Sequence, residues 1–285
     1  MKNLSRLVLS SRPLSWVNTA LPFAAAYFFG GGGFTSELVW ISLFFLIPYN
    51  LLMYGINDVY DYESDLRNPR KGGLEGALLP PELHRPMLLW AYGISLPIAL
   101  WIYLINFSNF AASAVFLLTM FAVVAYSVKG LRFKELPVVD SVTSSIHFVG
   151  PMLFGLLLVR EPDATLWLVA IAFFLWGAAS HAFGAVQDVR ADREAGINSI
   201  ATAFGARATV RFAFALYAGT GSLLLLLPDR FVFASLAALP YLYVTAREWN
   251  ITDEICERAN RGWRLFLLWN FLAGALISSL LIGPL

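Results

Sequence analysis

Residues 38–65 read LVWISLFFLIPYNLLMYGINDVYDYESD. The run 38–56 is almost wholly apolar and matches the length of about 20 residues that a helix needs to cross a bilayer. Three carboxylates, Asp58, Asp61 and Asp65, follow directly after it. This stretch therefore predicts a transmembrane helix that ends in a cluster of acidic side chains.

The rest of the chain repeats the apolar pattern. Of its 285 residues, 58% are hydrophobic and 14% are charged, whereas soluble domains average about 45–50% apolar and about 25% charged residues. The first apolar run lacks a small-residue cleavage site and follows Arg12-Pro13, so we expect a retained helix and not a signal peptide. We predict an all-α, polytopic membrane protein, folded as one domain over 1–285, with transmembrane helices near 14–30, 38–56, 86–105, 109–127, 137–159, 164–186, 207–227, 230–246 and 264–283.

Charge asymmetry predicts the orientation. If the N-terminus is cytoplasmic and nine helices alternate, eighteen of the 20 Lys and Arg residues fall on the cytoplasmic side, and only Arg160 and Arg230 on the other. A bias of this kind is typical of cytoplasmic loops. Fifteen of the 19 Asp and Glu residues fall on the same side. We therefore expect a plasma-membrane protein with its active site at the cytoplasmic mouth of the helical bundle.

Charge and cysteine content exclude other classes of partner and site. The net charge of +1 gives no indication of a nucleic-acid partner, because the basic residues are spread along one membrane face among acids. The single Cys256 excludes an intrachain disulfide and a cysteine-based metal cluster.

A second acidic motif follows the sixth predicted helix. Residues 188–192 read DVRAD and repeat the D-x-x-x-D spacing of residues 61–65. Each motif lies at the expected cytoplasmic end of a helix, and the two are four helices apart. This spacing suggests two four-helix halves plus a ninth helix, with the two acidic clusters facing each other.

The acidic motifs predict a magnesium site. On a continuing helix, Asp58, Asp61 and Asp65 would share one face, where three carboxylates repel one another unless cations hold them together. Magnesium prefers oxygen ligands and is usually held by one or two carboxylates, waters and substrate phosphates. Asn57 can add or orient an amide oxygen. The alternative is a solvated charged loop, which is weakened because Asp58 and Asp188 abut apolar helices, where ionisable residues are functional candidates. The predicted metal ligands, which we also expect to be catalytic, are Asp58, Asp61, Asp65, Asp188 and Asp192.

Basic residues flank both motifs. Arg forks and Lys ammonium groups match phosphate oxygens. For any single residue, anchoring at the cytoplasmic face explains the charge equally well, but as a group near the acids they favour an anionic ligand bridged by metal. The candidates are Arg67, Arg70, Lys71, Lys129, Arg132, Lys134, Arg190 and Arg193.

Polar residues also lie within predicted helices: Asp140 and His147 on the fifth, His181 on the sixth and Asn18 on the first. The functional interpretation is a cavity wall, in which Asp140 orients Tyr126 or a basic residue and a histidine handles a proton. The alternative is hydrogen bonding between helices. We favour that alternative for His147 and Asn18, and weigh the two equally for His181, which lies two turns before the second acidic motif.

Metal ions and basic side chains around a diphosphate predict a dissociative reaction. They stabilise charge on the leaving diphosphate, so that an allylic C–O bond can ionise to a carbocation. The chain has 23 Phe, 11 Tyr and 9 Trp residues, and aromatic faces stabilise cations. Tyr60 and Tyr126 lie nearest to the motifs, and Tyr126 is our candidate for a catalytic aromatic residue.

The motif N-D-x-x-D-x-x-x-D at 57–65, together with D-x-x-x-D at 188–192, resembles the paired motifs of the UbiA superfamily of intramembrane prenyltransferases. Arg12-Pro13 with Asn18, and DREAG at 192–196, also fit. The resemblance covers the whole chain. It implies nine transmembrane helices around a central cavity open to the cytoplasmic side, with a magnesium-dependent site.

One departure from the superfamily concerns the lysine that contacts phosphate. Members often show Y-x-x-x-K between the two motifs, but here Gly130 occupies the fourth position after Tyr126. Lys129 and Lys134 both remain candidates.

Within the superfamily the chain is most similar to the bacterial lycopene elongases of C50-carotenoid synthesis. This resemblance implies that dimethylallyl diphosphate donates a five-carbon unit to each end of lycopene, giving a flavuxanthin-like product through a one-end-prenylated intermediate. Attack leaves a tertiary carbocation that must lose a proton, and a hydroxyl in the product would require water or an oxidation step. The stretches that carry the resemblance are SRPLSWVNT at 11–19, MYGINDV at 53–59, NPRKGG at 68–73, GAVQDV at 184–189 and WNITD at 249–253.

Three alternatives stay open. The acceptor can be an aromatic or quinone precursor, as for other superfamily members. A transporter also places carboxylates in the membrane, but it needs midplane polar residues reachable from both sides, whereas these acids gather at one face. A purely structural subunit explains neither acidic cluster. The expected partners are dimethylallyl diphosphate, lycopene or another lipophilic acceptor, the lipid bilayer and other carotenoid-pathway enzymes.

Overall fold

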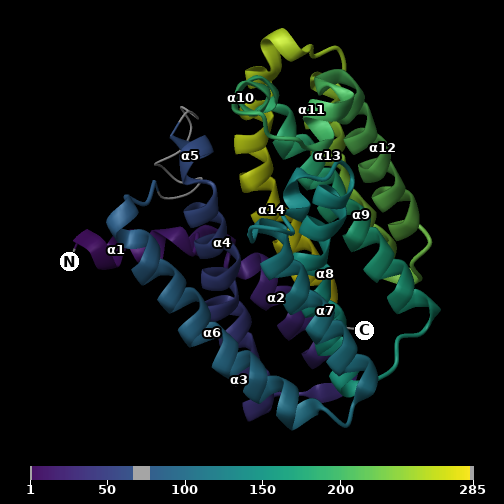
Figure 1. Ribbon diagram of the computed structural model, residues 1–285. Coiled ribbons are helices and arrows are strands. Elements are labelled where there is room, and N and C mark those ends of the chain that lie inside the picture. Colours follow the sequence, from purple (N-terminus) through teal and green to yellow (C-terminus); the bar gives the residue numbers. More distant parts are fainter. Residues whose placement is uncertain (1, 67–77, 283–285) are drawn as a thin grey trace. The chain divides into compact units, whose positions relative to one another are not determined.

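The computed structural model describes residues 2–66 and 78–282, except for the side chains of residues 2–4 and 64. Throughout this part of the chain the regular structure is helical (Figure 1). The chain divides into two compact units, residues 1–133 with 146–161, and residues 134–145 with 162–285. Helix α8 (Val139–Val159) contributes residues to both units.

The first unit is built around α4, which packs against α3, α6 and α7. A cluster of aromatic side chains fills its core, with Phe45 in ring contact with Phe23 and Tyr49, and Phe116 with Phe154. The helices of this unit, besides part of α8, are α1 (Lys2–Ser10), η1 (Pro13–Ser15), α2 (Val17–Tyr27), η2 (Phe28–Gly32), α3 (Ser36–Leu46), α4 (Pro48–Tyr60), α5 (Tyr62–Asp65), η3 (Pro81–Leu83), α6 (His84–Asn106) and α7 (Phe110–Ser127).

The single helix predicted over 38–56 is two helices, α3 and α4, which meet at Ile47. The cause is Pro48, which cannot donate a backbone hydrogen bond and starts α4. The fully buried Asn50 donates from Nδ2 to the carbonyls of Phe45, at 2.8 Å, and Leu46, at 3.1 Å. Its side chain thereby satisfies carbonyl groups that the break exposes.

The second unit packs α9 against α12, with α13 and α14 alongside. Two close approaches depend on glycine: a Cβ at Gly184 would lie 2.9 Å from the indole of Trp263, and one at Gly262 would lie 2.8 Å from Phe183. Small residues at such crossings let membrane helices approach closely. Besides part of α8, this unit comprises α9 (Ala164–Val186), α10 (Val189–Ala195), α11 (Ile200–Phe204), α12 (Ala206–Leu224), η5 (Asp229–Ala238), α13 (Leu239–Arg247), η6 (Asp253–Arg258) and α14 (Ala259–Ile282), while η4 (Phe133–Glu135) lies at the boundary.

The protein is a multi-pass membrane protein. Within the described residues, six helical stretches are long and apolar enough to span a bilayer: Ser36–Tyr60, Pro81–Asn106, Phe110–Ser127, Val139–Val159, Ala164–Val186 and Asp253–Ile282.

The remaining three predicted spans differ in detail. The segment 14–30 contains α2, of only 11 residues. The segment 207–227 is α12, with 19 residues. The segment 230–246 is the 3-10 helix η5 followed by the 9-residue α13. The count of nine spans therefore stays a prediction.

Candidate functional site

Asp58 lies in the last turn of α4 and is 1% exposed. Its Oδ1 is 3.3 Å from Nη2 of Arg12, in an ion pair that spans 46 residues of sequence. The Arg12 guanidinium also lies over the ring of Tyr54, 4.4 Å from its centroid. Within the described residues, Oδ2 of Asp58 is buried and has no hydrogen-bond partner. One carboxylate oxygen of Asp58 is therefore paired with Arg12, and the other, which we call its open oxygen, is buried without a hydrogen-bond partner in the described part of the chain.

Arg12 was not among the predicted site residues. In the sequence it counted only as one of the cytoplasmic basic residues and as part of the Arg12-Pro13 pair that fits the family resemblance. It adopts a left-handed backbone conformation with φ 50, in the connection before η1. Burial opposes its positive charge, but the adjacent carboxylate of Asp58, assisted by Tyr54 and Asp65, outweighs burial and holds the pKa of the guanidinium above its ordinary value. Arg12 is therefore a fixed cation against the first acidic motif.

Asp61 and Asp65 continue the first motif, and both are buried at 9% and 7% exposure. The expectation of one continuing helix is wrong here, because α4 ends at Tyr60, Asp61 has φ −99 and ψ 0, and α5 begins at Tyr62. The backbone N–H of Asp65 nevertheless donates to Asp61 O at 2.8 Å, so the helical spacing persists across the junction.

Arg132 extends the charged network of this unit. Its Nη2 lies 3.5 Å from Oδ1 of Asp61, and its Nη1 donates to the Tyr60 carbonyl at 3.5 Å. A positive φ of 41 at Arg132 and of 94 at Gly130 turns the chain after α7. This turn places one predicted phosphate ligand directly on a predicted metal ligand.

Asn57 and Tyr126 belong to the same unit. Ser127 donates its hydroxyl to Oδ1 of Asn57 at 3.1 Å, which joins the end of α7 to the end of α4. The ring of Tyr126 lies edge-on to the ring of His147, with centroids 5.2 Å apart. The backbone carbonyl of His147 accepts from the hydroxyl of Tyr49 at 2.9 Å. These contacts involve the ring edge and the backbone carbonyl of His147, so a hydrogen-bonding role for its imidazole stays a prediction.

The donor chemistry of this unit fits magnesium. Within the described part of the chain, no three His, Cys, Asp or Glu side chains converge as a ready-made metal site. Magnesium does not require such a cage, because it commonly takes one or two carboxylates and completes its shell with water and substrate phosphate. The open Oδ2 of Asp58 is a ligand atom of the required kind.

The second motif lies at the junction of α9 and α10. Asp188, with φ −101 and ψ −3, precedes α10 as its N-cap residue, and the N–H of Asp192 donates to Asp188 O at 2.8 Å. Both carboxylate-bearing residues are half-buried, whereas Arg190 and Arg193 are exposed.

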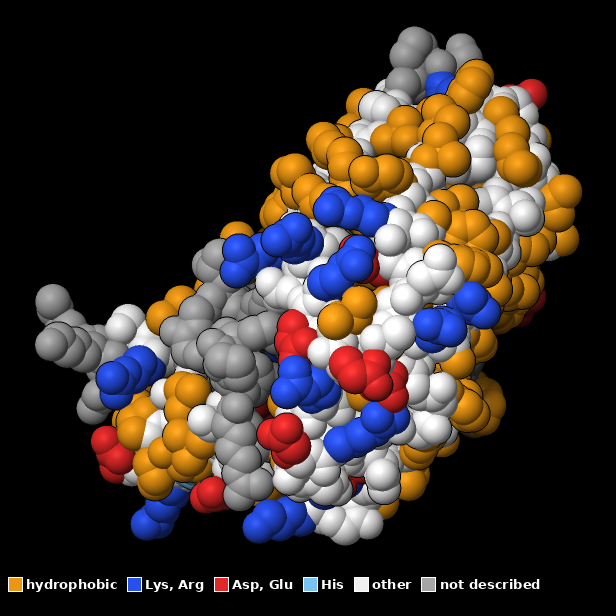
Figure 2. Space-filling model, turned by 90° about the horizontal axis from the view of Figure 1, so that it is seen from above, with side chains coloured by type: hydrophobic (Ala, Val, Ile, Leu, Met, Phe, Trp, Pro, Cys, Tyr) orange, Lys and Arg blue, Asp and Glu red, His pale blue; other side chains and the backbone are white. Residues whose placement is uncertain are grey.

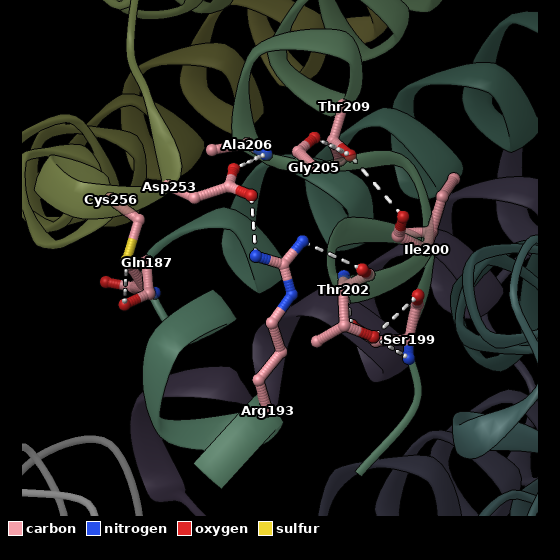
Figure 3. Close-up of polar contacts among 10 residues, drawn as sticks. All are labelled: Gln187, Arg193, Ser199, Ile200, Thr202, Gly205, Ala206, Thr209, Asp253 and Cys256. Atoms are coloured by element: carbon pink, nitrogen blue, oxygen red, sulfur yellow. Dashed lines mark hydrogen bonds and ion pairs between the residues drawn. The ribbon is translucent and has the colours of Figure 1, made fainter. Parts of the chain in front are cut away.

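A polar network holds α10 in place (Figure 3). Arg193 donates from Nη1 to Oδ2 of Asp253 at 2.6 Å and from Nη2 to the Thr202 carbonyl at 3.0 Å. Oδ1 of Asp253 accepts the N–H of Ala206, the first residue of α12, at 2.6 Å. Arg193 thus serves the fold next to Asp192, and Asp253 is a site-organising residue absent from our predicted set.

Asp140 has a structural role. It is fully buried, and its two oxygens accept the backbone N–H groups of Ser141 and Ile200, each at 2.6 Å. Because both oxygens are engaged by backbone, any contribution of Asp140 to substrate binding would be indirect. On the same helix, the Ser141 hydroxyl lies 3.0 Å from Nδ1 of His181, which places that histidine in a polar contact between α8 and α9.

The other predicted site residues fall in different places. Arg67, Arg70 and Lys71 lie outside the described residues. Lys129 is exposed, whereas Lys134, on η4, and Asn18, on α2, are half-buried. Figure 2 looks onto the end of the molecule that carries α10, where Lys and Arg side chains are interspersed with Asp and Glu.

Known proteins are similar to this one over most of the chain. The model of the UbiA prenyltransferase family matches residues 19–272. The lycopene elongase/hydratase of Corynebacterium glutamicum is 49% identical over 285 residues, which cover 99% of this chain and 98% of that protein. A C50 beta-cyclic carotenoids biosynthesis protein of Dietzia is 50% identical over 98% of this chain and 65% of its own length.

The fold is shared with solved structures. A UbiA homolog from Archaeoglobus fulgidus, bound to DMAPP and Mg2+, superposes with a TM-score of 0.69 at 21% identity, over 95% of this chain and 99% of that one. At this identity the likeness concerns the fold alone. The match of the family model over most of the chain shows that this protein belongs to the UbiA prenyltransferase family.

Proposed function

We propose that the protein is a magnesium-dependent lycopene elongase, which transfers dimethylallyl groups from dimethylallyl diphosphate to the ends of lycopene and forms a flavuxanthin-like C50 carotenoid. The observation that carries this proposal is the 49% identity, over nearly the whole of both chains, to a lycopene elongase/hydratase. The Archaeoglobus homolog, which shares the fold and was solved with DMAPP and Mg2+ bound, supports the same donor and metal.

The metal and the donor diphosphate are assigned to the carboxylates of the acidic motifs, as the spacing of the motifs in the sequence predicts. Asp58, Asp61 and Asp65 provide carboxylates from the first motif, and Asp188 and Asp192 from the second. The buried Asp58, with its open Oδ2, is the best supported of these ligands. Magnesium, when bound, supplies positive charge that stabilises the leaving diphosphate. The candidates for direct contact with the diphosphate or its metal are Asn57, Arg67, Arg70, Lys129, Arg132 and Lys134. Asn18 and His181 are candidates for the cavity wall.

The chain's own groups carry the remaining steps. Arg12 and Arg132 pair with Asp58 and Asp61 before the substrate binds, and so orient these carboxylates. Cationic side chains near the leaving oxygen stabilise the negative charge that develops there. The C–O bond of the donor breaks as the allylic cation forms, and the ring of Tyr126 faces that cation. The terminal alkene of lycopene then forms the new C–C bond.

The resulting tertiary cation is resolved by loss of a proton to give an alkene or by capture of water to give an alcohol. The Corynebacterium relative is named a hydratase as well as an elongase, which supports water capture. Product mass distinguishes the two, because hydration adds one water for each prenylated end.

Nine transmembrane helices place the N-terminus and the active site on the cytoplasmic side and the C-terminus on the other. The distribution of Lys and Arg residues supports this orientation. Alkaline phosphatase fused after the last residue should be active in a bacterial host, and green fluorescent protein fused there should be dark. The reverse pattern would reject an odd number of spans.

The test of function is pigment analysis in a lycopene-accumulating bacterium. Expression should yield carotenoids that carry one and then two added five-carbon units, resolved by chromatography and mass spectrometry. An Asp188→Asn variant, present in membranes at the same level, should leave lycopene unchanged. If the parent protein also leaves lycopene unchanged while dimethylallyl diphosphate is available, lycopene is not the acceptor, and aromatic acceptors are then screened with the same donor.

A further inference from the structure

A cavity of about 570 Å³ with a charged lining lies within the second unit. Two of its lining residues contact the segment of the second acidic motif: Asn260 donates to Gln187 at 2.8 Å, and Glu257 pairs with Arg190 at 3.2 Å. It is formed where α13 ends, along η6 and at the beginning of α14. Four arginines and two glutamates contribute to its wall. The lining residues are Arg247, Glu248, Glu257, Arg258, Asn260, Arg261 and Arg264.

The two glutamates of this cavity already have cationic partners. Glu248 is 3% exposed, with Oε2 3.4 Å from Nη2 of Arg258 and Oε1 3.9 Å from Nε of Arg247. Glu257 pairs across the surface with Arg190 of α10 at 3.2 Å. The buried carboxylate of Glu248 therefore lies against two arginines of the cavity wall, Arg247 and Arg258. The charge of Glu257 is balanced by Arg190, which does not line the cavity.

Arg261 and Arg264 remain as an excess of positive charge. Both are exposed, and within the described part of the chain neither has a carboxylate at ion-pair distance. They are three residues apart on α14, so their side chains lie on one face of the helix. Two adjacent guanidinium groups beside a cavity are suited to a multivalent oxygen anion, because each can offer two parallel N–H groups to it.

The position of the cavity along α14 selects the source of that anion. Directly after Arg264, α14 becomes an apolar helix of membrane-spanning length, and little of it is buried within the described chain. The cavity thus lies at headgroup level, where basic pockets bind anionic lipids.

We propose that this cavity binds the phosphate headgroup of an anionic phospholipid, with Arg261 and Arg264 as its ligands. Glu248 positions Arg247 and Arg258 beside the headgroup, and the acyl chains lie along the apolar face of α14. The arginine ligands are distinct from the carboxylates of the prenyl-transfer motifs, and lipid binding does not depend on the identity of the prenyl acceptor.

The experiment measures lipid retention by the full chain. The protein is purified in mild detergent from bacterial membranes, and its bound phospholipids are extracted and quantified by mass spectrometry. The parent protein should retain phosphatidylglycerol in preference to phosphatidylethanolamine, and the R261Q/R264Q variant should lose that retention several-fold. The matched control is R6Q/R207Q, which removes the same charge from two exposed arginines outside the cavity. It should retain lipid as the parent does.

Two results would overturn the proposal. Equal retention by R261Q/R264Q and the parent would show that these arginines do not hold lipid, and equal loss in the control would reduce the effect to net charge. A parallel titration with inorganic diphosphate separates the two sources of phosphate. If diphosphate binds in an Arg261- and Arg264-dependent manner while no anionic lipid is retained, the cavity is a soluble-anion site. Should the double variant not purify as a monodisperse species, R261Q and R264Q are compared singly, and each should show a partial loss.

Discussion

Asp61 and Asp188 hold the same backbone conformation, with φ/ψ of −99°/0° and −101°/−3°. Each lies where a long helix gives way to a short one, α4 to α5 and α9 to α10. Each accepts, at 2.8 Å, a hydrogen bond from the backbone N–H of the aspartate four residues later. The two D-x-x-x-D motifs therefore share a local fold as well as a spacing, which supports the internal repeat suggested by the sequence.

This shared conformation favours function over a solvated loop. The φ/ψ region near −90° and 0° is sparsely populated, and active-site residues are often found there. In both motifs the junction places two aspartates, four residues apart, directly after the end of an apolar helix. Two independent halves of the chain would not be expected to reproduce this geometry for solubility alone.

The first prediction concerns the two junction residues. Asp61→Asn and Asp188→Asn should each lower turnover on the order of 100-fold or more, because each removes a carboxylate charge proposed to bind metal and diphosphate. Asparagine accepts the same backbone conformation, so both variants should remain folded. Prenyl transfer by purified protein with added Mg2+ gives the rate, and size-exclusion chromatography checks the fold. Normal rates in both variants would remove these aspartates from the site.

The second prediction concerns the close approach of α9 and α14. Gly184→Ala should destabilise the protein by about 1–3 kcal/mol, because the new methyl would lie 2.9 Å from the Trp263 ring. Gly274→Ala on α14 is the matched control, since a Cβ there meets nothing within 4 Å in the described structure. Melting temperatures in one detergent compare the two. A Gly184→Ala variant as stable as the control would show that Trp263 moves aside freely.

Much of the fold could be predicted because a bilayer limits the choice to helices of a given length. Each of the six span-length helical stretches overlaps a predicted run, although the last begins at Asp253 where the prediction began at 264. Details set by single residues were harder. Pro48 divides the second run, and the segment 230–246 is half 3-10 helix, with Pro228 before it and Asp229 at φ 51.

The site was predicted unevenly for a physical reason. Acidic motifs are local in sequence, so spacing alone finds Asp58 and Asp188. Partners that arrive from afar leave no such signal: Arg12 meets Asp58 across 46 residues, and Asp253 meets Arg193 across 60. Arg12, which precedes an apolar helix, and Asp253, a single acidic residue outside both motifs, have no local sequence pattern that indicates their contacts.

The third prediction concerns Arg12 as the resident cation of Asp58. Arg12→Gln leaves the 1%-exposed Asp58 without its ion pair, and an unsatisfied buried group costs about 1–3 kcal/mol. The melting temperature should therefore fall in metal-free buffer. Added Mg2+ should raise the melting temperature of Arg12→Gln more than that of the parent protein, because a cation binding the folded state stabilises it and in this variant no guanidinium already lies against the Asp58 carboxylate.

Arg6→Gln is the control for this measurement, since Arg6 is exposed on α1. It should melt like the parent with and without Mg2+. An equal response of Arg12→Gln and the parent to Mg2+ would separate Asp58 from the metal, although Asp58 would remain a structural partner of Arg12.

The fourth prediction concerns Asp253, which joins the start of α12 to α10. Asp253→Ala removes the acceptor of the Ala206 N–H and the partner of Arg193. Loss of a helix cap costs about 0.5–2 kcal/mol, and the exposed ion pair adds at most about 1 kcal/mol. Because α10 also carries Asp192, turnover should fall along with stability. Asp253→Asn, which keeps an oxygen for Ala206, should recover most of the stability and less of the turnover.

The adjacent Glu254→Ala is the matched control, since Glu254 is exposed, and it should change neither quantity. A double-mutant cycle with Arg193→Gln measures the coupling directly. If Asp253 acts through Arg193 on α10, the two turnover losses will not add, because either substitution alone already releases the helix. Additive losses would mean that Asp253 and Arg193 act independently, and the position of Asp192 would then depend on neither.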